Sequence, residues 1–152
     1  MKQEVIYFSS PIGCLKICLQ NNELYFIKKS LIKKQASFKI SPCAQKIKTQ
    51  LKEYFNSQRN SFSIPLAQRG TGFQRQVWKQ LQTIPYGQTQ TYKEISLKLG
   101  DKNKARPVGQ ACSQNPFLII IPCHRVLSQK NLGGFALGLK AKRKLLNLES
   151  KN

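Results

Sequence analysis

The chain has 152 residues, 40% of them apolar, which is enough to bury the core of one domain or of two small ones. Its 26 Lys and Arg against 6 Asp and Glu give a net charge of +20, which favours a polyanionic partner such as nucleic acid. The same excess arises where lysine is simply the usual surface residue, so charge alone does not decide. Neither an apolar run long enough to span a membrane nor a signal-peptide pattern occurs, so we expect a cytoplasmic protein without a membrane partner.

Three short runs rich in β-forming residues open the chain, at residues 4–10, 14–20 and 23–29. Turn-forming residues separate them: Pro11 to Gly13 after the first run, and Asn21 with Asn22 after the second. The short connections predict an antiparallel meander of three strands.

A helix is predicted to follow the strands, over residues 41–55. Ser41 is a candidate N-cap, Pro42 takes the first helical position, and apolar residues recur at helical spacing along one face. The strands and this helix together predict an α/β N-terminal domain, residues 1–66.

After a predicted linker at residues 67–72, the sequence pattern changes from β-rich runs to short helices. Thr71 and Thr91 each open a capping-box pattern, with Gln or Glu three positions later. The helix that starts at Thr91 ends near Gly100, and a third helix, residues 105–114, stops at Asn115 and Pro116. Two short helices joined by a polar turn are typical of a helix-turn-helix, although many helical domains contain such pairs.

The apolar run at residues 117–121 is predicted to be a short buried strand. Pro122 would end it and start a helical turn, which places Cys123 at a helix N-terminus, where partial positive charge favours a thiolate. The alternative is a buried structural cysteine. A Gly-rich loop and a basic amphipathic helix, up to residue 149, then complete a mainly helical C-terminal domain, residues 71–152.

His124 is the only histidine of the chain, and it directly follows Cys123. A histidine acting as a general base needs a partner that orients its ring. Glu149 is the best candidate among the six acids, but the sequence alone favours a solvated acid at a helix end. Arg125 is a further candidate for stabilising a thiolate.

The other cysteines do not predict a disulfide framework or a metal site. Their total of five is odd, and the expected compartment is reducing. Cys14 and Cys18 lack a second pair of ligands, so no zinc and no other cofactor is expected. We predict that Cys14, Cys18 and Cys43 are small buried apolar residues.

Four segments together resemble a known family: "PYGQTQTYKEIS", "ARPVGQACSQN", "IPCHRV" and "GGFALGLKAKRKLLNLE". In this order and spacing they are similar to the methylated-DNA–protein-cysteine methyltransferases, also called O6-alkylguanine-DNA alkyltransferases. The resemblance covers residues 71–149. Residues 1–65 resemble the ribonuclease-H-like N-terminal domain of that family only in texture and length.

The resemblance implies a role for several residues. Cys123 would accept the alkyl group, in a relay of Cys123, a water, His124 and Glu149. Arg106 would enter the DNA stack where the damaged base leaves. Tyr92 would press on the phosphate 3′ to the lesion and donate to the guanine.

The resemblance also implies how the other site residues act. Asn115 would be the hinge between the recognition helix, which enters the minor groove, and the segment that carries Cys123. The remaining residues expected at the DNA or the damaged base are Gly109, Ser113, Arg125, Phe135 and Ala136. Phe135 stands where the family usually has tyrosine, and a hydroxyl that would touch the guanine or the backbone is therefore missing.

The function implied is a DNA repair protein, monomeric, that acts on duplex DNA containing O6-alkylguanine, with O4-alkylthymine as a second candidate substrate. It would flip the damaged base out and transfer the alkyl group irreversibly to itself, once per chain. Two other functions stay open on the residues alone. One is a cysteine hydrolase using Cys123 and His124, and the other is a DNA-binding regulator without transfer.

Overall fold

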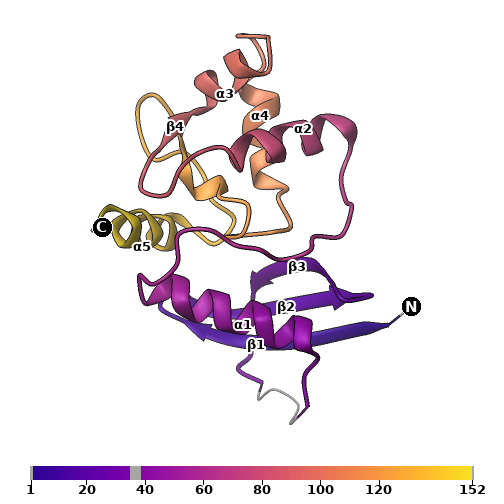
Figure 1. Cartoon of the computed structure of the whole chain (residues 1–152). Coiled ribbons are helices and arrows are strands. Elements are labelled where there is room, and N and C mark those ends of the chain that lie inside the picture. The colour runs from indigo at the N-terminus through magenta and orange to yellow at the C-terminus, as the bar shows by residue number, and fades with distance from the viewer. Residues whose placement is uncertain (1, 35–38, 152) are drawn as a thin grey trace. The chain divides into compact units, whose positions relative to one another are not determined.

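The structure is a computed structural model that describes residues 2–34 and 39–151 (Figure 1). The chain divides into two compact units, Met1–Gln68 and Arg69–Asn152, and each is considered by itself. No helix within the described residues is long and apolar enough to cross a membrane.

The first unit contains the predicted meander. Strands β1 (Gln3–Ser10), β2 (Gly13–Gln20) and β3 (Glu23–Lys29) form one antiparallel sheet in the order β1-β2-β3. Asn21 and Asn22 connect β2 to β3 with φ of 52° and 65°. A two-residue hairpin of this kind needs positive φ at both positions, which asparagine tolerates better than most residues.

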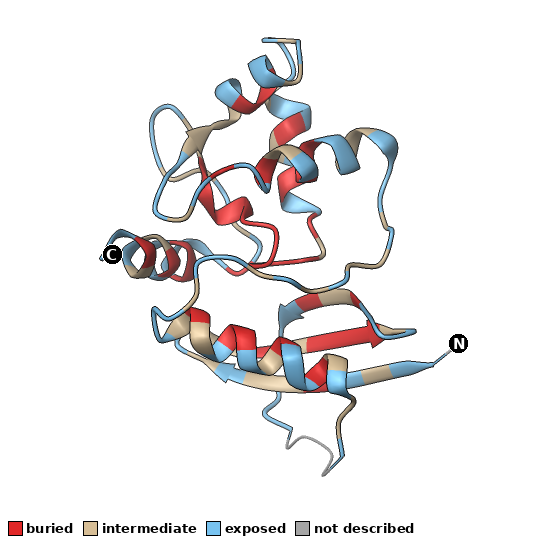
Figure 2. Cartoon of the chain, in the orientation of Figure 1, coloured by how far each residue is buried: buried red, intermediate tan, exposed pale blue. Residues whose placement is uncertain are grey.

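Helix α1 (Pro42–Phe55) lies on one face of this sheet (Figure 1). The hydroxyl of Ser41 accepts a hydrogen bond from the Ala44 backbone N–H at 3.1 Å, which confirms the predicted N-cap. The buried face of α1 is red in Figure 2. The prediction for the three cysteines of this unit is only partly right. Cys18 is buried, whereas Cys14 and Cys43 are half-exposed near strand and helix ends.

The second unit is mainly helical. Its helices are α2 (Gly72–Leu81), α3 (Tyr92–Lys98), α4 (Ala105–Ser113) and α5 (Leu139–Ser150). Both predicted capping boxes are present, at Thr71 and Thr91. The Trp78 indole anchors α2 to α4, since its Nε1–H donates to the Ala111 carbonyl at 2.8 Å.

A two-stranded parallel pair was not predicted from the sequence. Strand β4 (Gln90–Thr91) directly precedes α3, and β5 (Val126–Leu127) directly follows the Cys-His segment. Pairing β4 with β5 aligns the first turn of α3 with the chain that leaves the Cys-His segment. Such short strand pairs depend on residues far apart in the chain, so no local sequence pattern predicts them.

The segment 117–121 is buried but is not the strand that the sequence predicted. The Ile121 N–H donates to the Phe117 carbonyl at 2.9 Å, so the segment turns back on itself. Ile119 has a φ of 73°, which a strand does not allow. The cause lies in Asn115, whose side chain accepts from the Phe117 N–H and donates to the Ile121 carbonyl, each at 2.9 Å. These two bonds offer the backbone an alternative to a sheet ladder.

Candidate active site

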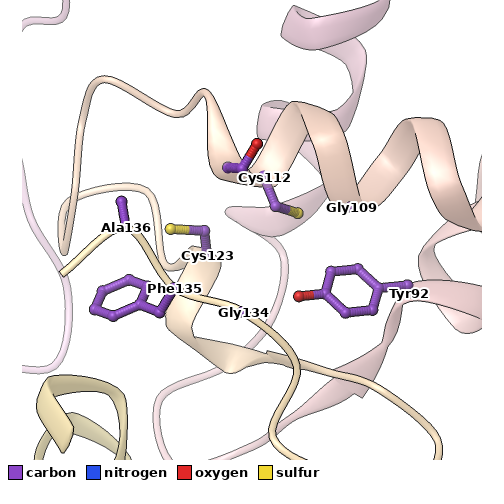
Figure 3. Close-up of a pocket in the computed structure, with 8 residues that line it drawn as sticks. Tyr92, Gly109, Cys112, Cys123, Gly134, Phe135 and Ala136 are labelled. Atoms are coloured by element: carbon purple, nitrogen blue, oxygen red, sulfur yellow. The ribbon is translucent and has the colours of Figure 1, made fainter. Parts of the chain in front are cut away.

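The second unit contains a cavity of about 270 Å³ that reaches Cys123 (Figure 3). Its walls come from α3, α4, the Cys-His segment and the Gly-rich loop. The lining residues are Tyr92, Gly109, Cys112, Ser113, Cys123, Gly134, Phe135 and Ala136. Five of these were expected from the sequence at the DNA or the damaged base, and a sixth, Cys123, was expected to accept the alkyl group.

Cys123 begins a 3₁₀ turn, η1 (Cys123–Arg125), which Pro122 precedes as predicted. Its side chain is buried, and burial raises the pKa of the thiol to about 11, although a hydrogen bond with the Asn115 side chain and the charge of Lys142 act to lower it. Burial thus outweighs the partial positive charge that a helix N-terminus was expected to supply. A single 3₁₀ turn offers too small a dipole to offset the desolvation of a buried anion.

His124 is completely buried behind Cys123 and contacts Glu149. Its Nε2 lies 2.6 Å from Glu149 Oε2. Burial lowers the pKa of the imidazole, and Arg125 offsets the opposing effect of the Glu149 carboxylate. The ring is thus neutral, with Nε2–H donating to Glu149. Its Nδ1 has no hydrogen-bond partner among the described residues, so this nitrogen is left as an acceptor.

Glu149 is buried and bound by two side chains, so it is not the solvated acid at a helix end that the sequence also allowed. In addition to His124, it accepts from Arg125, whose Nε lies 2.7 Å from Oε1 and whose Nη2 lies 3.2 Å from Oε2. The Arg125 Nη1 donates to the Ile84 carbonyl at 2.8 Å. Arg125 is therefore buried, and its guanidinium is fully engaged with Glu149 and the Ile84 carbonyl. It was expected at a surface that faces DNA, and it does not lie there. It neutralises Glu149 and fixes the carboxylate that orients His124.

Tyr92 closes the cavity on the side away from Cys123. Its hydroxyl points from α3 toward the loop that carries Gly134 (Figure 3). A Cβ on Gly133 would lie 2.8 Å from this hydroxyl, and Gly133 has a φ of 70°, so both space and backbone require glycine there. A Cβ on Gly109 would lie 3.7 Å from the Tyr92 ring. Small residues thus let helix α4 and the loop approach one aromatic ring.

Two predicted DNA-contacting residues lie on the surface of α4. Arg106 is exposed in its first turn and does not line the cavity. Ser113 is exposed at its end and lines the cavity mouth, where its hydroxyl donates to the Gln110 carbonyl at 2.7 Å. The structure therefore brings together Cys123, His124, Glu149 and Asn115, and leaves Arg106 apart from them.

Comparisons with known proteins show to which family the chain belongs. A family model described as "6-O-methylguanine DNA methyltransferase, DNA binding domain" matches residues 72–151, more than half of the chain. This chain belongs to the methylated-DNA–protein-cysteine methyltransferase family. A probable member from Acanthamoeba polyphaga mimivirus is 40% identical over 153 residues, covering 100% of this chain and 99% of the relative.

Solved structures of the family share the fold of the whole chain. The Mycobacterium tuberculosis protein OGT in complex with DNA has a TM-score of 0.85 and 37% identity, covering 98% of this chain and 92% of that one. The O6-methylguanine methyltransferase of the same organism has a TM-score of 0.84 and 34% identity, covering 99% of this chain and 94% of that one.

Three residues of this methyltransferase-family site were missed from the sequence. Cys112 and Gly134 line the cavity, and Lys142 lies buried beside it. A signal existed for Lys142, because it precedes Glu149 by seven residues and so lies on the same helix face. The neighbouring basic residues Lys140, Arg143 and Lys144 made Lys142 look like part of a solvated basic face. Among the described residues, no group of three or more His, Cys, Asp or Glu lies close enough to hold a metal ion.

Proposed function

We propose that this protein repairs DNA by moving the alkyl group of O6-alkylguanine onto Cys123. The relatives are named for transfer from methylated DNA to a protein cysteine. The observation that carries the assignment of Cys123 is its place at the cavity, directly before a neutral histidine that a buried carboxylate orients. No other described cysteine adjoins such a base.

The chemistry follows from the protonation states. The thiol is protonated at rest, so its proton leaves as the reaction proceeds, through a bridging water to Nδ1 of His124. The bond from Sγ to the alkyl carbon forms while the bond from that carbon to O6 breaks, and the guanine leaves with the electron pair and regains a proton. A thioether offers water no carbonyl to attack, so the protein acts once.

The DNA is engaged through α3 and α4, which pack against each other as the two helices of a helix-turn-helix. Helix α4 would be the recognition helix in the minor groove, because its cavity-facing residues Gly109 and Ser113 are small. The flipped guanine would enter the cavity against Tyr92, Phe135 and Ala136. Exposed Arg106 would fill the vacated stack, at a flipping cost of a few kcal/mol.

The finer features of the assembly belong to the same proposal. Residues 71–152 would act as the transfer domain, and residues 1–66 would be a ribonuclease-H-like domain. The protein would act as a monomer on duplex DNA with alkylated guanine, and O4-alkylthymine would be a second substrate.

The test is intact mass after incubation with an excess of duplex DNA containing O6-methylguanine. We expect one added methyl per chain, and peptide mapping should place it on Cys123 with Cys112 unmodified. The variant Cys123→Ala should gain no mass yet still bind the lesion, since the cavity is otherwise unchanged. A methyl on another cysteine, more product than protein, or binding without any mass change would contradict the proposal.

A further inference from the structure

Lys142 is a buried cation that forms no ion pair with a carboxylate of residues 2–34 or 39–151. It lies on α5 with 0% of its surface exposed, and its Nζ donates to the Val126 carbonyl at 2.6 Å and the Gly134 carbonyl at 3.0 Å. The buried carboxylate of Glu149 pairs instead with His124 and Arg125. Burying an ammonium with carbonyls alone is costly. A methionine would fill the same space without that cost.

The two carbonyls that Lys142 binds belong to the two segments that build the cavity. Val126 follows η1, which carries Cys123 and His124. Gly134 lines the cavity together with its neighbours Phe135 and Ala136. Lys142 therefore ties the loop that covers the cavity to the segment that carries the reactive thiol.

The charge of Lys142 acts on the same groups. The titratable groups that interact with it are Cys112 on α4 and Cys123 and His124 in η1. Burial lowers the pKa of Lys142, while negative charge on either thiol would raise it. A thiolate at Cys123 is thus the counter-ion that this buried ammonium lacks.

We infer that Lys142 is a positioning residue for alkyl transfer: it holds the Gly134 loop over the cavity and supplies the positive charge that stabilises the Cys123 thiolate as the thiol loses its proton. The inference rests on the proposed function of Cys123. The charge balance is complete, because the thiol proton goes to His124, the negative charge on Sγ is consumed when the bond to the alkyl carbon forms, and the guanine that leaves with the electron pair takes up a proton from solvent. No additional reactant is needed.

The experiment compares four variants in single-turnover reactions with free O6-benzylguanine at pH 7. Lys142→Gln keeps a donor for one carbonyl without the charge, Lys142→Met removes both, and Lys142→Arg keeps the charge. Lys140→Met is the matched control, because Lys140 is exposed on the same helix. Binding of a duplex with O6-methylguanine is measured separately, with each change made in a Cys123→Ala background.

We expect the Gln and Met variants to react at least about tenfold more slowly, because a rise of about one unit in the thiol pKa lowers the thiolate fraction tenfold. Their lesion binding should change little, Lys142→Arg should recover most of the rate, and Lys140→Met should match the wild type. If Lys142→Gln reacts at the wild-type rate, the inference is wrong. Equal losses of binding and transfer without rescue by arginine would also overturn it, since they indicate loop packing alone. Failure of the wild type to gain an alkyl group on Cys123 would instead contradict the proposed function.

Discussion

His124 is held neutral although it forms a 2.6 Å hydrogen bond with a carboxylate. Burial disfavours the charged imidazole, and the Glu149 charge that would favour it is already paired with Arg125. A neutral ring keeps its Nδ1 lone pair, which is what a general base beside Cys123 needs. In the proposed reaction, Arg125 would act by compensating the charge of Glu149.

The lowered pKa of His124 predicts how stability depends on pH. Below pH 6.5 the unfolded chain binds a proton at His124 that the folded protein does not, so stability is present above that pH and is lost as the pH falls toward the folded pKa. The loss should approach about 1.4 kcal/mol per pH unit in urea unfolding. Because His124 is the only histidine, NMR titration of its ring gives the folded pKa directly. A value above 6.5 would contradict the prediction.

Arg106 should matter for flipping and not for the chemistry. We expect Arg106→Ala to slow repair of O6-methylguanine in duplex DNA strongly, because the vacated stack is left empty, while its reaction with free O6-benzylguanine changes little. Single-turnover rates on the two substrates test this. Arg69→Ala is a suitable control, since Arg69 lies before α2 and outside the cavity. Equal losses on both substrates would show that Arg106 does not fill the stack.

The Gly-rich loop depends on glycine at one position because two elements meet there. Gly133 adopts positive φ and leaves no room between the loop and the Tyr92 hydroxyl of α3. The parallel pair β4–β5 fixes this approach, since β4 leads into α3 and β5 leads into the loop.

We predict that Gly133→Ala destabilises the protein by about 1–3 kcal/mol through backbone strain and the contact with Tyr92. In a Tyr92→Phe background the cost should be smaller, because the hydroxyl that the new Cβ meets is gone. Urea unfolding of the four proteins in this double-mutant cycle measures the coupling. Gly72→Ala is the control, as a Cβ there meets nothing within 4 Å. Additive effects would mean that the Tyr92 contact is not the cause.

Lysines and arginines are distributed over both units of the chain, which carries a net charge of +20. If this charge serves DNA binding, affinity should fall steeply with salt, because each phosphate contact releases about 0.9 counterions. The measurement is the slope of log affinity against log salt concentration for an undamaged duplex. A slope near zero would show that the lysines form an ordinary solvated surface and do not bind phosphates.

The elements whose signals are local follow from the sequence alone. The three strands with their Asn-Asn turn, the Ser41, Thr71 and Thr91 caps, and the amphipathic α5 each depend on residues within one turn or hairpin of each other. The motif around Cys123 and His124 likewise identified the family and six cavity-lining residues, because residue order along the chain carries it. The ribonuclease-H-like character of the first unit stays a prediction.

Only the tertiary structure decided the features that burial or particular side-chain hydrogen bonds determine. The run 117–121 has the composition of a strand, but the Asn115 side chain bonds both its ends and makes it a turn. The Cys123 thiol is adjacent to positive groups in sequence, yet burial outweighs them and keeps it protonated. In the sequence, Lys142 cannot be told from the surface lysines around it, whereas in the structure it is completely buried. For Cys123 and Lys142 the deciding cause is desolvation, which the composition of the chain around them does not reveal. For the run 117–121 it is the pair of hydrogen bonds from the Asn115 side chain, whose partners only the folded backbone brings into reach.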